Sequence, residues 1–422
     1  MKTQDDADRV PTPAVDATPN IPTPATMTNN TIVSPKSPKS PKKFSLRTVL
    51  TFLGFALGGA AIGAFGAQVG KQTELAHALF GDVSAFGALD LFMLPLHFFV
   101  VILLHELGHL AGGMARGMRF LLLIVGPLRL RRTVSGLKLD WFLRGDTFGG
   151  LAAAMPPANR STPRAFMSLV VGGPLASLTL AAIAFSLAIA LDGRWAVHAA
   201  ILGAMSALIF VVTAIPMRAG GFMSDGMQAL ELLRGGSAVE QRMTLIAAYA
   251  ESLAGVRPRE RNPALLERGL ALAGKEPLRD VSLWWMAYQV ALDRRELELA
   301  GQWLDRVAEG FDGYPAGFRQ ALACDVAFFA ARYRHDLPAA TAWYARAKGG
   351  MVEASARALT EAAIALLRGD TADALAAVDR GEGKLRDISD AGAIPFLRDE
   401  LHALRAEAEA VRDNGSDFDV SR

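Results

Sequence analysis

Hydrophobic residues are concentrated in the first half of the chain, in runs long enough to cross a lipid bilayer. A helix needs about 20 predominantly apolar residues to span the hydrocarbon core. Four segments meet this length: 46–69, 89–113, 165–191 and 196–216. A core helix of a large soluble domain could account for one such run. Four of them within about 170 residues indicate a membrane domain instead.

A different pattern separates the second and third apolar runs. Residues 128–131 and 137–140 alternate apolar and polar side chains, with a short turn sequence between them. Alternation with a period of two is typical of a β-strand, so this stretch predicts a short β-hairpin. The preceding apolar run, 120–125, is compatible with another strand or with a dip into the bilayer.

After about residue 235 the pattern becomes that of soluble helices. Three helix pairs recur with similar features, and the second helices carry Ala300, Ala340 and Ala374, which lie 40 and then 34 residues apart. These spacings are close to the 34-residue tetratricopeptide period. A helical bundle without repeats remains an open alternative. Stacked helix pairs would present a concave surface for a protein partner.

The chain is therefore predicted to be an all-α membrane protein with about four transmembrane helices and a short β-hairpin insertion. A soluble α-helical, tetratricopeptide-like repeat domain follows the membrane domain. The expected boundaries are a disordered basic tail over 1–44, a transmembrane domain over 45–235, a helical-repeat domain over 236–413 and a disordered tail over 414–422. The first tail is rich in Pro, Ser and Thr and shows no apolar periodicity, which is typical of disorder.

The distribution of charged residues predicts how the chain is oriented in the membrane. The formal net charge is only +2, so a nucleic-acid partner has no support. Five basic residues lie between positions 36 and 47, at the start of the first span, and six lie between 116 and 138, after the second, whereas the connections 71–88 and 192–195 hold one each. Basic residues favour the cytoplasmic side, so both termini are expected in the cytoplasm. The lysines of 34–43 are expected to contact anionic membrane lipids. The single cysteine, Cys324, excludes an internal disulfide.

The second apolar run contains the sequence His105-Glu106-Leu107-Gly108-His109. Histidines at i and i+4 project from one helix face at a separation that suits two imidazoles on one Zn²⁺. Glu106 is then placed to take a proton from a water on the metal. Two unrelated histidines near a helix end are the alternative, but ionisable side chains are costly where water is scarce. The motif therefore predicts a zinc hydrolase in a membrane.

A catalytic zinc needs three protein ligands and an open position. The position six residues after His109 is alanine, and no glutamate occurs between Glu106 and Glu231. The charge distribution places His198 and Asp192 on the opposite side of the membrane from the HELGH sequence. His97 lies two helical turns before His105, too far along the helix axis to share the metal. Residue patterns leave three carboxylates open as the third ligand: Asp140, Asp146 and Asp225.

The order of these motifs resembles the site-2 protease family of intramembrane zinc metalloproteases. The resemblance rests on the HELGH sequence, on residues 173–177 (Gly-Pro-Leu-Ala-Ser) in a later span, and on the Asp225-Gly226 pair after the next one. It implies that His105, His109 and Asp225 bind Zn²⁺ and that Glu106 is the catalytic base. It also implies regulated cleavage of transmembrane protein substrates, and a multi-pass location in the inner membrane of a bacterium.

Two positions depart from the pattern of this family. Ser177 stands where asparagine is frequent, and Ser224 stands just before the Asp-Gly pair, where Asn-Pro is frequent. A membrane-anchored helical-repeat scaffold on an inactive protease-like core is the alternative function, although all four site residues are present. For an active protease, an edge strand within 120–141 could hold an unwound substrate, and Leu128 and Leu130 would then be the residues to test.

Overall fold

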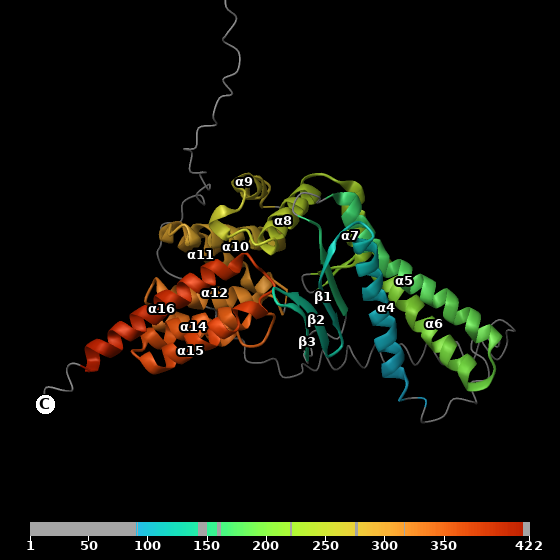
Figure 1. The fold of residues 1–422 in the computed structure, drawn as a ribbon. Coiled ribbons are helices and arrows are strands. Elements are labelled where there is room, and N and C mark those ends of the chain that lie inside the picture. Colours follow the sequence, from blue (N-terminus) through green and yellow to red (C-terminus); the bar gives the residue numbers. More distant parts are fainter. Residues whose placement is uncertain are drawn as a thin grey trace, which may run out of the picture.

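The computed structural model describes residues 90, 92–141, 150–157, 162–219, 222–274, 277–315 and 317–416. The described part of the chain is mostly helical, with a four-stranded antiparallel sheet and a short two-stranded one (Figure 1). The first expected span, 46–69, and the expected disordered tail, 1–44, lie outside the described residues. So do residues 417–422 of the expected C-terminal tail.

Three helices of the described part are long and apolar enough to cross a membrane. They are α4 (Leu94–Met114), α5 (Pro163–Ala190) and α6 (Gly193–Ala214). Most of each helix surface is not buried inside the protein, and large apolar side chains such as Leu107, Ile183 and Leu208 are exposed. An apolar surface of this kind is stable against lipid. These helices correspond to the second, third and fourth expected spans.

The expected hairpin is present, but it belongs to a larger sheet. Four strands pair in the order β3-β2-β1-β4, all antiparallel. Their bounds are β1 Arg119–Val125, β2 Leu128–Thr133, β3 Gly136–Trp141 and β4 Gly150–Met155. The run 120–125 is thus a strand. Gly126 and Gly136 adopt positive φ angles of 55° and 128° in the tight turns, where a side chain would be strained.

A short segment joins the third apolar helix to the helical region. Strands β5 (Arg218–Ala219) and β6 (Phe222–Met223) pair as a small hairpin, and α7 (Asp225–Arg234) starts directly after them. The side chain of Glu231 on α7 is buried and forms ion pairs with Arg242 and Arg279. These contacts fix the direction of α7 relative to the helical region.

The helical region consists of α-helices with short 3-10 turns between some of them. The helices are α8 Ser237–Leu253, α9 Pro263–Ala271, α10 Pro277–Asp293, α11 Leu297–Gly310, α12 Arg319–Arg332, α13 Leu337–Arg346, α14 Ala354–Leu367, α15 Thr371–Gly383 and α16 Ala393–Ser416. The 3-10 turns are η2 Pro258–Glu260, η3 Phe311–Gly313 and η4 Leu385–Asp387. Helix α16 continues three residues past the expected boundary at 413.

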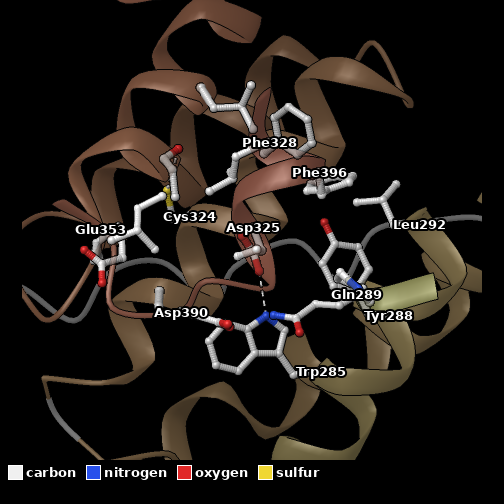
Figure 2. Close-up of a pocket in the computed structure, with 18 of the residues that line it drawn as sticks. Trp285, Tyr288, Gln289, Leu292, Cys324, Asp325, Phe328, Glu353, Asp390 and Phe396 are labelled. Atoms are coloured by element: carbon white, nitrogen blue, oxygen red, sulfur yellow. Dashed lines mark hydrogen bonds between the residues drawn. The ribbon is translucent and has the colours of Figure 1, made fainter. Parts of the chain in front are cut away.

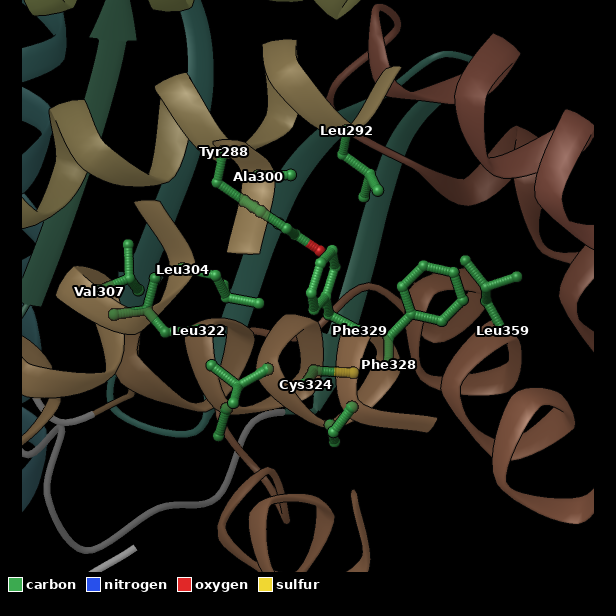
Figure 3. Close-up of a cluster of buried hydrophobic side chains, with 14 of the residues drawn as sticks. Tyr288, Leu292, Ala300, Leu304, Val307, Leu322, Cys324, Phe328, Phe329 and Leu359 are labelled. Carbon is green, nitrogen blue, oxygen red and sulfur yellow. The ribbon is translucent and has the colours of Figure 1, made fainter. Parts of the chain in front are cut away.

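One continuous hydrophobic core joins these helices. Tyr288 of α10 packs edge-on against Phe329 of α12, with ring centroids 6.0 Å apart, and Leu304 and Leu322 complete the contact (Figure 3). The three expected helix pairs are present as α10–α11, α12–α13 and α14–α15. Their assignment to a tetratricopeptide-like repeat is not confirmed and stays a prediction.

The sheet connects the membrane helices to the helical region (Figure 1). At its outer end, the turn between β2 and β3 donates two backbone hydrogen bonds, from Val134 to the Ile388 carbonyl at 2.9 Å and from Ser135 to the Arg386 carbonyl at 3.2 Å. On its other side β4 packs against α4. The sheet is therefore a direct physical link between α4 and the 385–390 segment.

Candidate metal centre

Helix α4 brings the two histidines of the HELGH sequence together. Because residues four apart lie one above the other on a helix, the Nε2 atoms of His105 and His109 are 3.2 Å apart, with the two rings nearly perpendicular. His105 and Glu106 are 4% and 6% exposed. Both side chains therefore point into the protein and away from the apolar surface of the helix.

Close packing of α4 on α5 depends on glycines. A Cβ atom on Gly108 would stand 2.4 Å from the Gly172 carbonyl oxygen, and a Cβ atom on Gly172 would stand 2.2 Å from the Gly108 carbonyl oxygen. A side chain at either position would push the helices apart. Gly173 then lies against His109, since its Cβ would stand 2.3 Å from Nε2. The small residues of α5 thus make room for the imidazole.

Helix α5 also orients both rings. His109 Nδ1 donates to the Leu169 carbonyl oxygen at 2.8 Å; a carbonyl can only accept, so the neutral ring keeps its lone pair on Nε2. His105 Nδ1 lies 2.8 Å from Ser177 Oγ. If the hydroxyl accepts this bond, His105 has the same tautomer. Such partners fix metal-binding histidines, so Ser177 has a polar role in this chain.

Asp225 reaches the histidines from the first residue of α7. Its Oδ2 atom lies 3.3 Å from His105 Nε2 and 3.5 Å from His109 Nε2. Ser224 caps the helix, because its hydroxyl accepts from the Met227 amide at 3.2 Å. Ser224 thus ends the preceding turn and starts α7 at the carboxylate.

The same serine ties α7 to the end of α6. Its hydroxyl donates to the Ile215 carbonyl at 2.7 Å and accepts from the Met217 amide at 3.0 Å. Gly226 packs against α6 so closely that a Cβ would stand 1.8 Å from the Ala214 carbonyl oxygen. The Asp-Gly pair therefore combines the carboxylate with the one residue type that fits this contact.

Strand β4 covers the remaining side of Glu106. A Cβ atom on Gly150 would stand 2.2 Å from Glu106 Oε1. The backbone of Ala152 makes a hydrogen bond to the Glu106 carboxylate. The sheet thus holds this carboxylate in place, and the glycine at the start of β4 permits the approach.

The donor set fits a zinc ion. One ligand atom each from His105, His109 and Asp225 all lie within 4.8 Å of one another. Two imidazole nitrogens and one carboxylate oxygen are ligands that Zn²⁺ takes in catalytic sites, where a fourth position stays open. Within the described parts of the chain, this is the group of histidine, cysteine or acidic residues that could hold a metal.

Of the other two carboxylates considered as the third ligand, Asp140 lies elsewhere. Asp140 of β3 pairs with Arg129 and Arg131 at 3.1 and 2.8 Å. Burial alone would raise the pKa of Asp140. The hydrogen bonds and charges of the two arginines outweigh burial, so the pKa lies below its usual value. Asp146 lies outside the described residues. His97 stacks on His198, apart from the HELGH histidines.

Three contributors to the site were not singled out by the sequence pattern. The Leu169 carbonyl carries no side-chain signal, and Gly150 lies outside any motif. The close helix contact at Gly172 was detectable in principle, because small residues at short spacing mark tight helix packing in membranes.

One comparison with known proteins gives a match. The model of peptidase family M50 matches residues 93–372, which include the HELGH helix, the serine of α5, Asp225 and much of the helical region. No curated protein and no solved structure matches the chain. The match covers well over half of the 422 residues. The chain belongs to peptidase family M50, the site-2 protease family of metallopeptidases.

Proposed function

We propose that the protein is an intramembrane zinc protease that hydrolyses peptide bonds of membrane-spanning substrates. The observation that carries this proposal is the convergence of His105, His109 and Asp225, with Glu106 beside them, at the depth of an apolar helix. All four residues are retained, which favours an enzyme over a scaffold on an inactive core. A buried ionisable cluster of this kind in a membrane domain is costly unless it has a function.

His105, His109 and Asp225 would hold the metal, and Glu106 would move the protons. Bound Zn²⁺ supplies Lewis acidity, which lowers the pKa of a water molecule and balances negative charge. Glu106 accepts the proton as the water attacks the scissile carbonyl, and then passes it to the leaving amine. The Ala152 hydrogen bond and the contact with Gly150 hold the carboxylate in position for both transfers.

Strand β4 is the place where we expect the substrate to bind in an extended form. Peptide bonds inside a helix are shielded by their own hydrogen bonds, so the substrate must unwind. An edge strand can hold an unwound segment by strand addition, and β4 is the edge strand beside Glu106. The expectation for Leu128 and Leu130 is corrected here, since both lie in β2, an internal strand of the sheet.

The charge distribution supports one orientation of the chain in the membrane. We propose that the protein is a multi-pass protein of a bacterial inner membrane with both termini in the cytoplasm, as the positive-inside rule predicts. The metal centre then lies toward the cytoplasmic end of α4. The helical region would recruit a protein partner or the substrate on the same side.

The decisive experiment compares the wild type with Glu106→Gln on a model transmembrane substrate. We expect stoichiometric zinc in both proteins, and cleavage reduced by a factor of about 10² to 10⁴ in the variant, as for loss of a general base. Glu298→Gln, at an exposed position on α11, is the matched control. Wild-type protein with zinc but without cleavage of any transmembrane substrate would contradict the protease.

The Asp225→Asn variant distinguishes loss of a metal ligand from loss of the catalytic base. We expect this variant to lose zinc as well as cleavage, because an amide is a much weaker zinc ligand than a carboxylate. Asp192→Asn, at an exposed position just before α6, should retain both. Full zinc content in Asp225→Asn would show that another residue supplies the third ligand.

A further inference from the structure

The helical region contains a cavity of about 210 Å³, separate from the metal centre. It lies between α10, α12, α14 and the start of α16 (Figure 2). Four aromatic side chains contribute to its wall: Trp285, Tyr288, Phe328 and Phe396. Ligand pockets for drug-sized molecules run from about 300 to 1,000 Å³, so this cavity suits a smaller compound.

Asp325 lines the cavity and forms no ion pair with the described residues; Arg261, which also lines it, donates to Gln289 and Ser252. Trp285 Nε1 donates to the Oδ2 atom of Asp325 at 2.5 Å, as the dashed line in Figure 2 shows. Among the described residues, no basic side chain lies within ion-pair distance of Asp325. The other two carboxylates of the wall have partners, since Glu353 pairs with Arg131 at 3.0 Å and Asp390 accepts from a serine hydroxyl at 2.7 Å.

This environment makes an ionised Asp325 costly. Burial raises the pKa of its carboxyl to about 6, although the Trp285 hydrogen bond opposes the rise. At neutral pH the group is therefore mostly a carboxylate, held in a largely apolar cavity. A carboxylate in such an environment without a counterion costs free energy, and a cation placed beside Asp325 would recover part of that cost.

A second polar group shares this cavity with Asp325. Tyr288 is 2% exposed, and its hydroxyl has no hydrogen-bond partner among the described residues. A phenol oxygen accepts hydrogen bonds from an ammonium group, as a carboxylate does. The faces of the surrounding aromatic rings also attract a cation.

We propose that this cavity binds a small organic cation, an ammonium joined to one apolar ring or short chain. The ammonium pairs with Asp325 and donates to the Tyr288 hydroxyl. The apolar body lies against Phe328 and Phe396. This site is independent of the protease chemistry, and its ligand reaches it from the aqueous side of the helical region.

The test is isothermal titration calorimetry of the full chain in detergent, with phenethylamine as the probe. We expect saturable binding of phenethylamine and affinity weaker by about tenfold or more for 2-phenylethanol, which has the same ring without the charge. Equal affinity for the two compounds, or no saturable binding of phenethylamine, would overturn the proposal. This comparison needs no variant, so folding defects do not affect it.

Two variants locate the site. Asp325→Asn should weaken phenethylamine binding by about tenfold or more, because it removes a charge-assisted hydrogen bond. Ala356→Phe should abolish binding by filling the cavity that Ala356 lines. Glu298→Gln is the control with an exposed carboxylate in the same region and should bind like the wild type. Unchanged affinity in a folded Asp325→Asn variant would reject this cavity as the site.

Discussion

Gly150 and Glu106 are in direct contact, although 44 residues separate them in the sequence. No room exists for a side chain at position 150, because a Cβ atom there would overlap the carboxylate of Glu106. The contact joins the first residue of β4 to the proposed catalytic base. It makes the position of the sheet a determinant of the active-site geometry.

Gly150→Ala should therefore impair cleavage without removing zinc. The added methyl group must displace either β4 or the Glu106 side chain, and a small displacement of a general base is costly. We expect cleavage to fall by about tenfold or more, which corresponds to about 1.4 kcal/mol in the activation free energy. Zinc content, measured on the same samples, should remain at the wild-type level.

Gly383→Ala is the matched control for this substitution. Gly383, near the end of α15, has open space around its position, so its cleavage rate should stay at the wild-type level. A Gly150→Ala protein that cleaves as fast as the wild type would show that β4 does not constrain Glu106.

Ser177→Ala tests the orientation of His105. Without the hydroxyl, Nδ1 loses its 2.8 Å partner, and the ring can rotate or change tautomer. Loss of such a partner typically lowers metal affinity by about 10- to 100-fold. Competition with a zinc chelator would measure this loss as a lower chelator concentration at half release.

Ser186→Ala provides the comparison on the same helix. Its hydroxyl is exposed and donates to the Ala182 carbonyl of its own helix at 2.9 Å. We expect zinc release from this variant to match the wild type. Identical zinc release from both serine variants would show that the Ser177 hydroxyl does not stabilise zinc binding.

Local patterns predicted the elements that depend on neighbouring residues. The apolar runs gave three of the membrane helices, and alternation over 128–140 gave the β2–β3 hairpin. Strand β4 was not predicted, because Leu-Ala-Ala-Ala has neither alternation nor β-branched residues. It forms a strand through pairing with the apolar β1, which is a contact between distant segments.

The residues of the candidate site also differ in whether local sequence patterns predict their position. His105 and His109 are four residues apart on one helix, so local geometry alone brings them together. Asp225 lies 116 residues after His109, and residue patterns left it as one of three candidates; the family resemblance selected it. The Leu169 carbonyl depends on how α5 rotates against α4, which a single sequence does not encode in any local pattern.

Arg131→Ala should loosen the contact between the sheet and the helical region. Arg131 is 15% exposed at its side chain, and it donates to Glu353 and to the Asp387 carbonyl, each at 3.0 Å. Hydrogen bonds to charged groups contribute about 1.5–3 kcal/mol each. We expect amide hydrogen exchange at Val134 and Ser135 to accelerate by about tenfold or more.

The neighbouring Arg132 offers a charge-matched control. Its side chain is exposed on the same strand, so Arg132→Ala should leave exchange at the β2–β3 turn unchanged. Exchange that accelerates equally in both variants would point to a general effect of charge and not to the contacts of Arg131.

Binding of phenethylamine should strengthen as the pH rises from 5 to 7.5. The pKa of Asp325 is raised to about 6 by burial, so the carboxyl is mostly neutral at pH 5 and mostly ionised at pH 7.5. The primary amine stays protonated over this range, as lysine does with a pKa near 10.4. Because the cation pairs with the ionised form, we expect affinity about tenfold weaker at pH 5, where about a tenth of the carboxyls are ionised.

Asp325→Asn identifies the group responsible for this dependence. The other titratable or charged groups that face the cavity are Tyr288, Cys324, Glu353, Asp390 and Arg261. Burial raises the pKa of Cys324 to about 12 and raises the pKa of Tyr288 well above its usual value, so both stay neutral between pH 5 and 7.5. Calorimetry on Asp325→Asn should give weak binding that is independent of pH. A tenfold dependence that persists in this variant would show that Asp325 is not the group responsible.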